Sequence, residues 1–258
     1  MPSAAHALGR VAAFGAQAAV VFGSGLAALP PGAALSAEIG YAELGWPCTT
    51  VPGHGNVLQL VEVEEGEAAG LRLALACGRP HGYEGWSPEE LERPVRALAA
   101  AGVAQFVLTN SSGALRAAVT PGDLVVCSAV VDLQAPPPGG APPSLGVCTP
   151  EEAAAVAAAV APAPARTGVY VAVAGPQFET PAEVAWLAGH GDVVGMSAAP
   201  EVRAVHAAGA ACCLLALVVN RAAAVGSHED VLAFGGRLAG TLAAGLGAVV
   251  TARWPGPL

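Results

Sequence analysis

The chain alternates short apolar runs with marked helix starts, and this alternation constrains its fold more than any other feature. Three segments share a hydroxyl residue, Pro, any residue and Glu: Ser87–Glu90, Thr149–Glu152 and Thr180–Glu183. In each, the hydroxyl caps a helix, Pro fits the first turn and Glu completes a capping box. Apolar runs that predict buried strands lie at 17–22, 57–64, 71–77, 104–109, 123–131, 168–174, 192–194 and 212–219. The pattern predicts an α/β fold with a mixed, largely parallel central sheet flanked by helices.

One stretch of the chain resembles a linker. Residues 134–147, beginning at Gln134, are too rich in Pro and Gly for regular structure. The strand pattern continues unchanged after them, so we expect a surface loop within a single domain that spans residues 1–258. A last helix, rich in Ala and Gly, is expected to begin near Ser227 and to run towards Trp254.

The composition excludes several classes of protein. With 54% hydrophobic and 12% charged residues, the chain is too apolar and too weakly charged to be disordered. It contains no Lys, and 11 Arg against 20 acids give a net charge of −9, which disfavours nucleic acid binding. Residues 11–37 carry no charge, but Gly and Pro interrupt them before a membrane-spanning helix of about 20 residues is complete. The six cysteines show no CxxC or Cys/His spacing, which favours a reduced, cytoplasmic protein without a metal site.

Polar residues are rare in this chain, and they gather directly after the predicted strands. Six such segments lie at 22–25, 78–85, 109–113, 175–179, 195–197 and 220–221. Ligands of open α/β sheets bind beyond the carboxyl ends of the strands, so we expect these loops to converge on one small-molecule pocket. Arg79, in the second segment, can hold an oxyanion through two hydrogen bonds, although a surface pair of Arg79 and His81 is the simpler alternative.

Two local motifs have competing interpretations. Gly23–Ala28 matches the dinucleotide pattern G-x-G-x-x-A, with Glu43 near the distance of the ribose-binding acid. Pro30 and Pro31 interrupt the helix that this pattern requires, so a tight anion-binding loop is favoured. Residues 195–199 resemble a nucleophile elbow, but they lack the final glycine of a serine hydrolase.

Nine short motifs, taken together, resemble those of the trimeric purine nucleoside phosphorylases. They are Gly23–Gly25, Val51–Gly55, Gly78–Gly85, Leu108–Asn110, Pro121–Asp123, Ala174–Thr180, Val194–Ser197, Pro200–Val202 and Asn220. Their order and spacing agree with the family over residues 15–245, and the stretch from Tyr170 to Glu201 is the most specific. The resemblance implies a homotrimer and phosphorolysis of purine nucleosides to free base and (deoxy)ribose 1-phosphate.

The resemblance also implies roles for individual residues. A phosphate site would contain Ser24, His54, Arg79, His81, Ser197 and the backbone N–H of Ser111. A base site would contain Phe178, Glu179, Val194 and Asn220, and a sugar site Tyr83, Tyr170, Met196 and His228. The catalytic residues would be His81, Glu84, Glu179 and Asn220. Inorganic phosphate would be a co-substrate, and no cofactor or metal would be needed.

The chemistry of these residues fits that reaction. Neutral donors together with Arg79 can hold a phosphate dianion in a dry pocket, despite the negative charge of the whole chain. Negative charge grows on the leaving purine as the glycosidic bond stretches, so a donor from Asn220 at N7 would stabilise the transition state more than the substrate. A carboxylate of Glu179 that accepts from N1–H, combined with the Asn220 amide, suits 6-oxopurine nucleosides such as inosine and guanosine.

The chain departs from the family pattern in two regions. Near the base and phosphate, Val219 replaces the usual Thr, and Asn110–Ala114 (Asn-Ser-Ser-Gly-Ala) replaces a run of small Ala and Gly residues. Near the sugar, Ala129–Asp132 replaces Asp-His-Ile-Asn, and no Phe occurs between Val107 and Tyr170, where the family's neighbouring subunit lends an aromatic. Two alternatives follow from the sugar region: a phosphorylase of 5′-modified nucleosides such as methylthioinosine, or a catalytically weakened nucleoside-binding homologue.

Overall fold

A mixed sheet of ten strands forms the centre of the protein, seen here in a computed structural model that describes residues 3–134, 143–160, 165–223 and 228–251. The strands are β1 (Ala18–Val21), β2 (Ala33–Gly40), β3 (Val57–Val63), β4 (Arg72–Ala76), β5 (Gln105–Ala114), β6 (Leu124–Asp132), β7 (Ser144–Gly146), β8 (Ala165–Ala172), β9 (Val193–Gly195) and β10 (Ala211–Arg221). Five strand pairs are parallel and five antiparallel, so the sheet is mixed as predicted, although parallel pairs do not outnumber antiparallel ones.

The connectivity brings the carboxyl ends of four central strands to one edge. The strand order is β10-β6-β8-β9-β5-β1-β4-β3-β2, with β7 on β6. Strand β10 also pairs with β5, so that β5, β10, β6, β8 and β9 close into a ring, and β1, β4, β3 and β2 continue the sheet from β5. Strands β4, β1, β5 and β10 run parallel to one another, and their carboxyl ends therefore face the same side.

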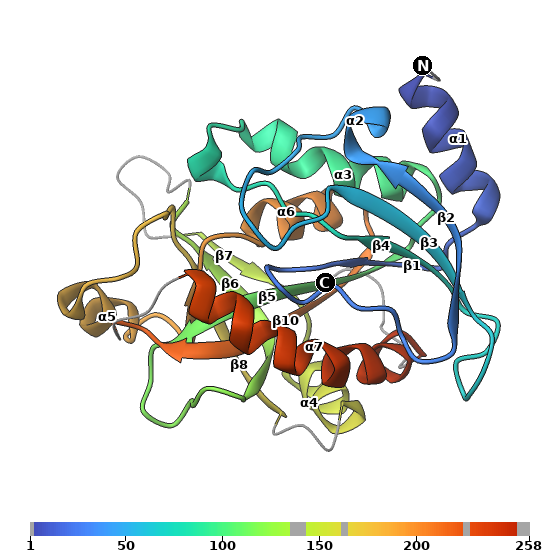
Figure 1. The fold of residues 1–258 in the computed structure, drawn as a ribbon. Coiled ribbons are helices and arrows are strands. Elements are labelled where there is room, and N and C mark those ends of the chain that lie inside the picture. Colours follow the sequence, from blue (N-terminus) through green and yellow to red (C-terminus); the bar gives the residue numbers. More distant parts are fainter. Residues whose placement is uncertain (1–2, 135–142, 161–164, 224–227, 252–258) are drawn as a thin grey trace.

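Helices cover both faces of the sheet (Figure 1). One face carries α1 (Ala4–Phe14), α2 (Tyr41–Leu44), α3 (Pro88–Ala100) and α6 (Ala199–Ala207), and the other carries α4 (Pro150–Ala159) and α7 (His228–Thr251). Helix α5 (Pro181–Leu187) lies at one end of the molecule. Ser87, Thr149 and Thr180 cap α3, α4 and α5, each with a Glu that closes a capping box, which confirms the three predicted helix starts.

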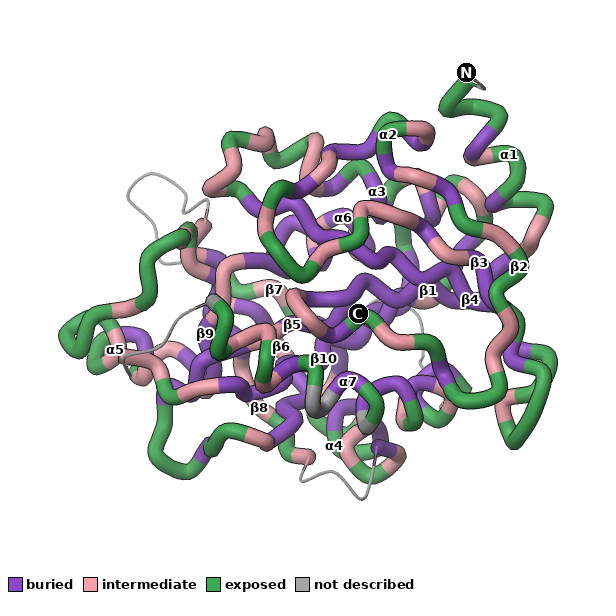
Figure 2. Tube along the Cα trace, in the orientation of Figure 1, coloured by how far each residue is buried: buried purple, intermediate pink, exposed green. Residues whose placement is uncertain are grey.

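The core lies between the sheet and the two helix layers, and the central strands are buried over most of their length (Figure 2). All four residues of β1 are buried, as are nine of the eleven residues of β10. All six cysteines are free thiols, and five of them are buried, where Cys behaves as a small hydrophobe. No helix within the described ranges is both long and apolar enough to cross a membrane.

Every predicted strand is present, but several boundaries differ. Strands β5 and β10 continue to Ala114 and Arg221, so two of the polar segments predicted as loops are strand ends. Of the predicted loop 134–147, residues 135–142 lie outside the described residues, and residues 144–146 form β7 rather than a loop. The last helix begins at His228, close to the predicted start, while Trp254 lies outside the described residues. The sequence patterns did not predict β2, β7, α1, α2 or α6.

Candidate active site

All six polar segments contribute to one pocket at the carboxyl ends of β1, β4, β5 and β10. The polar and aromatic residues that line it are Ser24, Arg79, His81, Tyr83, Asn110, Ser111, Ser112, Phe178, Glu179, Ser197 and Asn220. Met196, Pro176, Val194, Val219 and Val231 complete its apolar wall together with several glycines. The predicted convergence therefore occurs, and strands β5 and β10 carry some of these residues directly.

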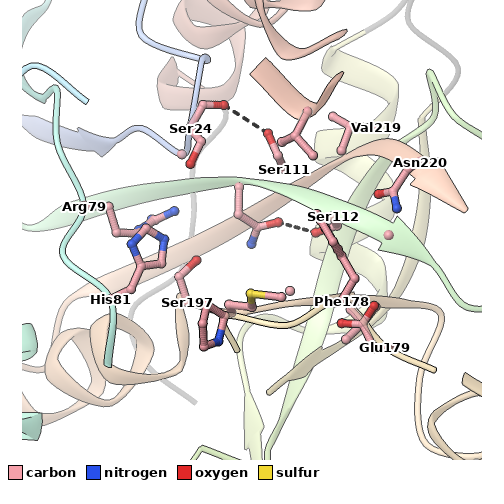
Figure 3. A pocket seen from close by; sticks show the side chains of 18 of the residues that line it. Ser24, Arg79, His81, Ser111, Ser112, Phe178, Glu179, Ser197, Val219 and Asn220 are labelled. Carbon is pink, nitrogen blue, oxygen red and sulfur yellow. Dashed lines mark hydrogen bonds between the residues drawn. The ribbon is translucent and has the colours of Figure 1, made fainter. Parts of the chain in front are cut away.

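Hydrogen-bond donors gather on one side of the pocket, which we call the donor end: Ser24, Arg79, His81 and Ser197 (Figure 3). The Ser24 hydroxyl lies 3.0 Å from Nε2 of His54, and the Ser111 hydroxyl donates to the carbonyl oxygen of Ser24 over 3.1 Å. A Cβ at Gly23 would lie only 2.7 Å from Cα of Asn110. Glycine therefore lets the loop after β1 rest directly on β5, which brings Ser24 to the pocket.

Arg79 is fixed at the donor end by buried partners. Its side chain is 1% exposed, and its Nε donates to Oε1 of Glu201 over 2.6 Å. Its Nη1 donates to the carbonyl oxygen of Thr109. A buried ion pair is tolerated when further hydrogen bonds satisfy both partners, as they do for this guanidinium. Glu201 offsets the charge of Arg79, so the donor end depends on neutral donors as well as on Arg79.

Glu84 orients His81 from behind the pocket. Its carboxylate accepts from the backbone N–H of His81 over 2.8 Å, and its Oε2 lies 3.5 Å from Nδ1 of the same residue. It also accepts from the Thr49 hydroxyl and from the Thr50 backbone N–H. Burial alone would raise the pKa of Glu84, but these hydrogen bonds, above all those with His81, lower it to about 2. The His81 ring in turn stacks on Tyr83, with centroids 4.9 Å apart and planes 16° from parallel.

The opposite side of the pocket, which we call the base end, carries Phe178, Glu179 and Asn220 (Figure 3). Burial raises the pKa of the Glu179 carboxyl above its usual range, and the charge of Glu183 raises it further. The register of β10 shifts between Val218 and Asn220, a bulge that lets the consecutive residues Val219 and Asn220 both line the pocket. One side of the pocket can thus bind an anion, and the other can exchange hydrogen bonds with a planar polar ring.

Comparisons with known proteins agree with this geometry. The family profile described as the Phosphorylase superfamily matches residues 17–251. The purine nucleoside phosphorylase of Mycobacterium tuberculosis is 38% identical over 243 residues, which cover 90% of this chain and 88% of that protein. Purine nucleoside phosphorylase 1 of Geobacillus stearothermophilus is 33% identical over 234 residues, 84% of each chain. The chain belongs to the phosphorylase superfamily.

A solved structure extends the likeness to the whole fold. Isoform 2 of purine nucleoside phosphorylase from Schistosoma mansoni, in complex with cytosine and ribose-1-phosphate, is 26% identical and superposes with a TM-score of 0.77. The superposition covers 96% of this chain and 95% of that one. With relatives named for one activity across most of its length, the chain is an enzyme of the purine nucleoside phosphorylase family.

Most of the residues that the family resemblance singled out line this pocket. These are Ser24, Arg79, His81, Tyr83, Ser111, Phe178, Glu179, Val194, Met196, Ser197 and Asn220. Burial of Arg79 and His81 also contradicts the alternative that they form a surface pair.

Three of the expected residues that the structure describes, His54, Glu84 and Tyr170, do not line the pocket. His54 and Glu84 stand one layer behind it, against Ser24 and His81. Tyr170 was expected beside the sugar, but it is fully buried in β8, and its hydroxyl accepts from the backbone N–H of Ser197 over 3.3 Å. Tyr170 therefore holds the backbone of Ser197, a residue of the donor end, from within the core. His228 begins α7, and its side chain lies outside what the structure describes.

The turn after Ser197 accounts for the resemblance of residues 195–199 to a nucleophile elbow. Ala198 has φ of 69° and ψ of −34°, and the backbone N–H of Ala199 donates to the carbonyl oxygen of Ser197 over 2.9 Å. This tight turn directs the chain from β9 into α6 and leaves Ser197 in the pocket wall. Among the described residues, no cluster of three or more His, Cys, Asp or Glu side chains offers a metal site.

The pocket also contains residues for which the sequence assigned no role, chiefly Asn110, Ser112 and Val231. Asn110 and Ser112 project from the same face of the extended β5, and each is 2% exposed. Their signal in the sequence was polarity within an otherwise apolar strand. Val231 belongs to α7, outside the nine motifs. An apolar residue in an apolar helix gives no indication in the sequence that it lines a pocket.

Proposed function

We propose that this phosphorylase cleaves 6-oxopurine nucleosides, namely inosine, guanosine and their deoxy forms, to free base and (deoxy)ribose 1-phosphate. Inorganic phosphate is the co-substrate, and no cofactor takes part. The observation that carries the proposal is the division of the pocket: Arg79, His81, Ser24 and Ser197 on one side, and Glu179 and Asn220 on the other. Ribose 1-phosphate, the sugar product, is a ligand of the Schistosoma mansoni relative.

The reaction uses both ends of the pocket. A phosphate oxygen held at the donor end attacks C1′ of the nucleoside, and the C1′–N9 bond breaks with its electron pair moving onto the purine. The Asn220 amide then donates to N7, where the negative charge collects, and this hydrogen bond is stronger in the transition state than in the substrate. Phosphate leaves the site as the sugar ester, and the purine takes up a proton.

The same residues favour a 6-oxopurine. Glu179 in its ionised form accepts from N1–H, which inosine and guanosine carry and adenosine lacks. Burial removes water from the Glu179 carboxylate, which is why its pKa is raised. The N–H group of a bound base would then donate the hydrogen bond that water no longer supplies. Asn220 offers both a donor and an acceptor, and the donor suits N7 and O6.

The proposal is tested by incubating the purified protein with inosine, guanosine, adenosine and methylthioinosine, with and without phosphate. Hypoxanthine or guanine release that requires phosphate, with adenosine the poorest substrate, is the expected result. Equal release without phosphate would identify a hydrolase instead.

Two other outcomes correspond to the alternatives raised by the sugar region. A preference for methylthioinosine over inosine would indicate a phosphorylase of 5′-modified nucleosides, consistent with the absence of a Phe between Val107 and Tyr170. Hypoxanthine binding without turnover of any nucleoside would indicate a binding homologue.

A further inference from the structure

The hydroxyl of Ser112 makes a hydrogen bond in the pocket wall that bears on how the site binds a ligand. It donates to Oδ1 of Asn110 over 2.5 Å, drawn as a dashed line in Figure 3. Both side chains line the pocket, and both are 2% exposed. The hydrogen bond joins residues two positions apart on one face of β5.

The nitrogen end of the Asn110 amide has no partner among the residues that the structure describes. Its Nδ2 is buried and makes no hydrogen bond to any part of the chain that the structure describes. A buried donor without a partner is costly, and such groups in native proteins usually await a ligand or water. The contact between Gly23 and Cα of Asn110 places this residue beside the Ser24 loop, on the donor side of the site.

The orientation of this amide decides what the pocket offers a ligand. The two ends of an Asn side chain have nearly the same shape but opposite hydrogen-bonding character. An amide that turned its oxygen towards the donor end would place a negative dipole against a bound oxyanion. An amide that turns its nitrogen there adds a donor to those of Ser24, His81 and Ser197.

We propose that Ser112 is a positioning residue for phosphate: its hydroxyl holds the Asn110 oxygen away from the anion, so that the amide presents its NH₂ group to phosphate. The inference rests on the proposed function, because it assigns phosphate to the donor end. In this chain, Ser112 supplies a hydroxyl that Ala or Gly could not.

The test compares Ser112→Ala, Asn110→Ala and the double variant with the unmodified enzyme. We expect Ser112→Ala to raise the KM for phosphate about three- to tenfold, the range that follows from losing one net hydrogen bond. The KM for inosine should change by less than about twofold. A general packing defect would instead change the KM of both substrates. Phosphate binding is also measured without nucleoside, by the shift in melting temperature that added phosphate causes. Ser128→Ala is the matched control, because its hydroxyl contacts Gly168 away from the pocket.

The double variant separates orientation from direct contact. If Ser112 acts through Asn110, removing it from the Asn110→Ala enzyme has no further effect on the phosphate KM. Additive effects, or an unchanged phosphate KM in Ser112→Ala, would overturn the inference. An enzyme that binds phosphate in a Ser112-dependent way but turns over no nucleoside would refute the proposed function and leave the inference standing. An enzyme that binds no phosphate at all would refute both.

Discussion

At the scale of single residues, Asn220 tests the base end most directly. Asn220→Ala removes the donor that we propose for the charge developing at N7, and a lost transition-state donor of this kind costs about 2.7–4 kcal/mol. We therefore expect kcat/KM for inosine to fall by about two to three orders of magnitude, with the phosphate KM little changed. Steady-state kinetics with each substrate varied in turn provide the measurement. An unchanged kcat/KM would remove Asn220 from the mechanism.

Arg79 requires a different test, because the residue is buried with Glu201. From the sequence alone, Arg79→Ala is expected to affect mainly the phosphate KM. The structure adds a stability effect, since the variant leaves the Glu201 carboxylate buried without its partner. Breaking such a pair costs about 3–5 kcal/mol of unfolding free energy.

Chemical denaturation checks this expectation, with Glu201→Gln added to Arg79→Ala as the compensating change. The double variant should recover part of the lost stability but not the phosphate affinity. If Arg79→Ala is as stable as the unmodified enzyme, the ion pair of Arg79 and Glu201 does not contribute to the free energy of unfolding as its burial predicts.

Glu179 predicts a pH dependence. Its pKa is raised, so the carboxylate that we propose accepts from N1–H is lost at a higher pH than for an ordinary glutamate. As pH falls through this raised value, kcat/KM for inosine at saturating phosphate should decline. Glu179→Gln should lower the rate and abolish that acidic limb, which separates it from the titration of phosphate itself. A limb that persists in the variant would belong to another group.

At the scale of elements, Glu84 joins the loop at residues 49–50 to the turn at residues 81–84. Its pKa is lowered to about 2 in the folded protein, and a depressed carboxyl pKa adds stability that is present above the unfolded value of about 4.5. That contribution is lost as pH falls from about 4.5 towards 2. Glu84→Gln should therefore be less stable at pH 7 and show a flatter loss of melting temperature between pH 5 and about 2.5. A parallel curve for both proteins would contradict the role of the carboxylate.

Elements were predictable where local chemistry determines them. Ser87, Thr149 and Thr180 each carry a complete capping signal, and α3, α4 and α5 begin where those signals place them. Strand β2 escaped prediction because it is mostly small residues and only one of its eight residues is buried, so it lacks an apolar run. Helix α6 follows Ala198 with a positive φ, a start without any side-chain cap.

The pocket was predictable in outline for a related reason. Its motifs follow strands, and the direction of the strands brings them together. Its detail was not predictable, because the extension of β5 through Ala114 decides that Asn110 and Ser112 share one face. Likewise, Tyr170 lies against Ser197 because β8 pairs with β9, and the residues of neither strand alone predict that pairing.

At the scale of the whole molecule, exposed aromatic residues beside the pocket form a candidate surface for contact between copies of the chain. Trp186 is 52% exposed and Phe178 40%, and both line a groove with Leu133 and Val173 that shares Phe178 and Glu179 with the active pocket. Exposed apolar patches of this kind mark interaction surfaces. An interface here would cover the base end of the pocket, so assembly and activity should be linked.

The resemblance to the trimeric phosphorylases implies three copies, and we predict a homotrimer that uses this groove. Size-exclusion chromatography with light scattering should give about 76 kDa, three times the chain mass of 25.2 kDa. Trp186→Glu places a charge in the groove and should shift the protein towards a single chain with reduced turnover of inosine. Leu35→Ala, which changes a residue 49% exposed on the distant strand β2, is the matched control and should leave the trimer intact. A trimer that survives Trp186→Glu would place the interface on another face, and an unmodified protein of 25.2 kDa would exclude the trimer.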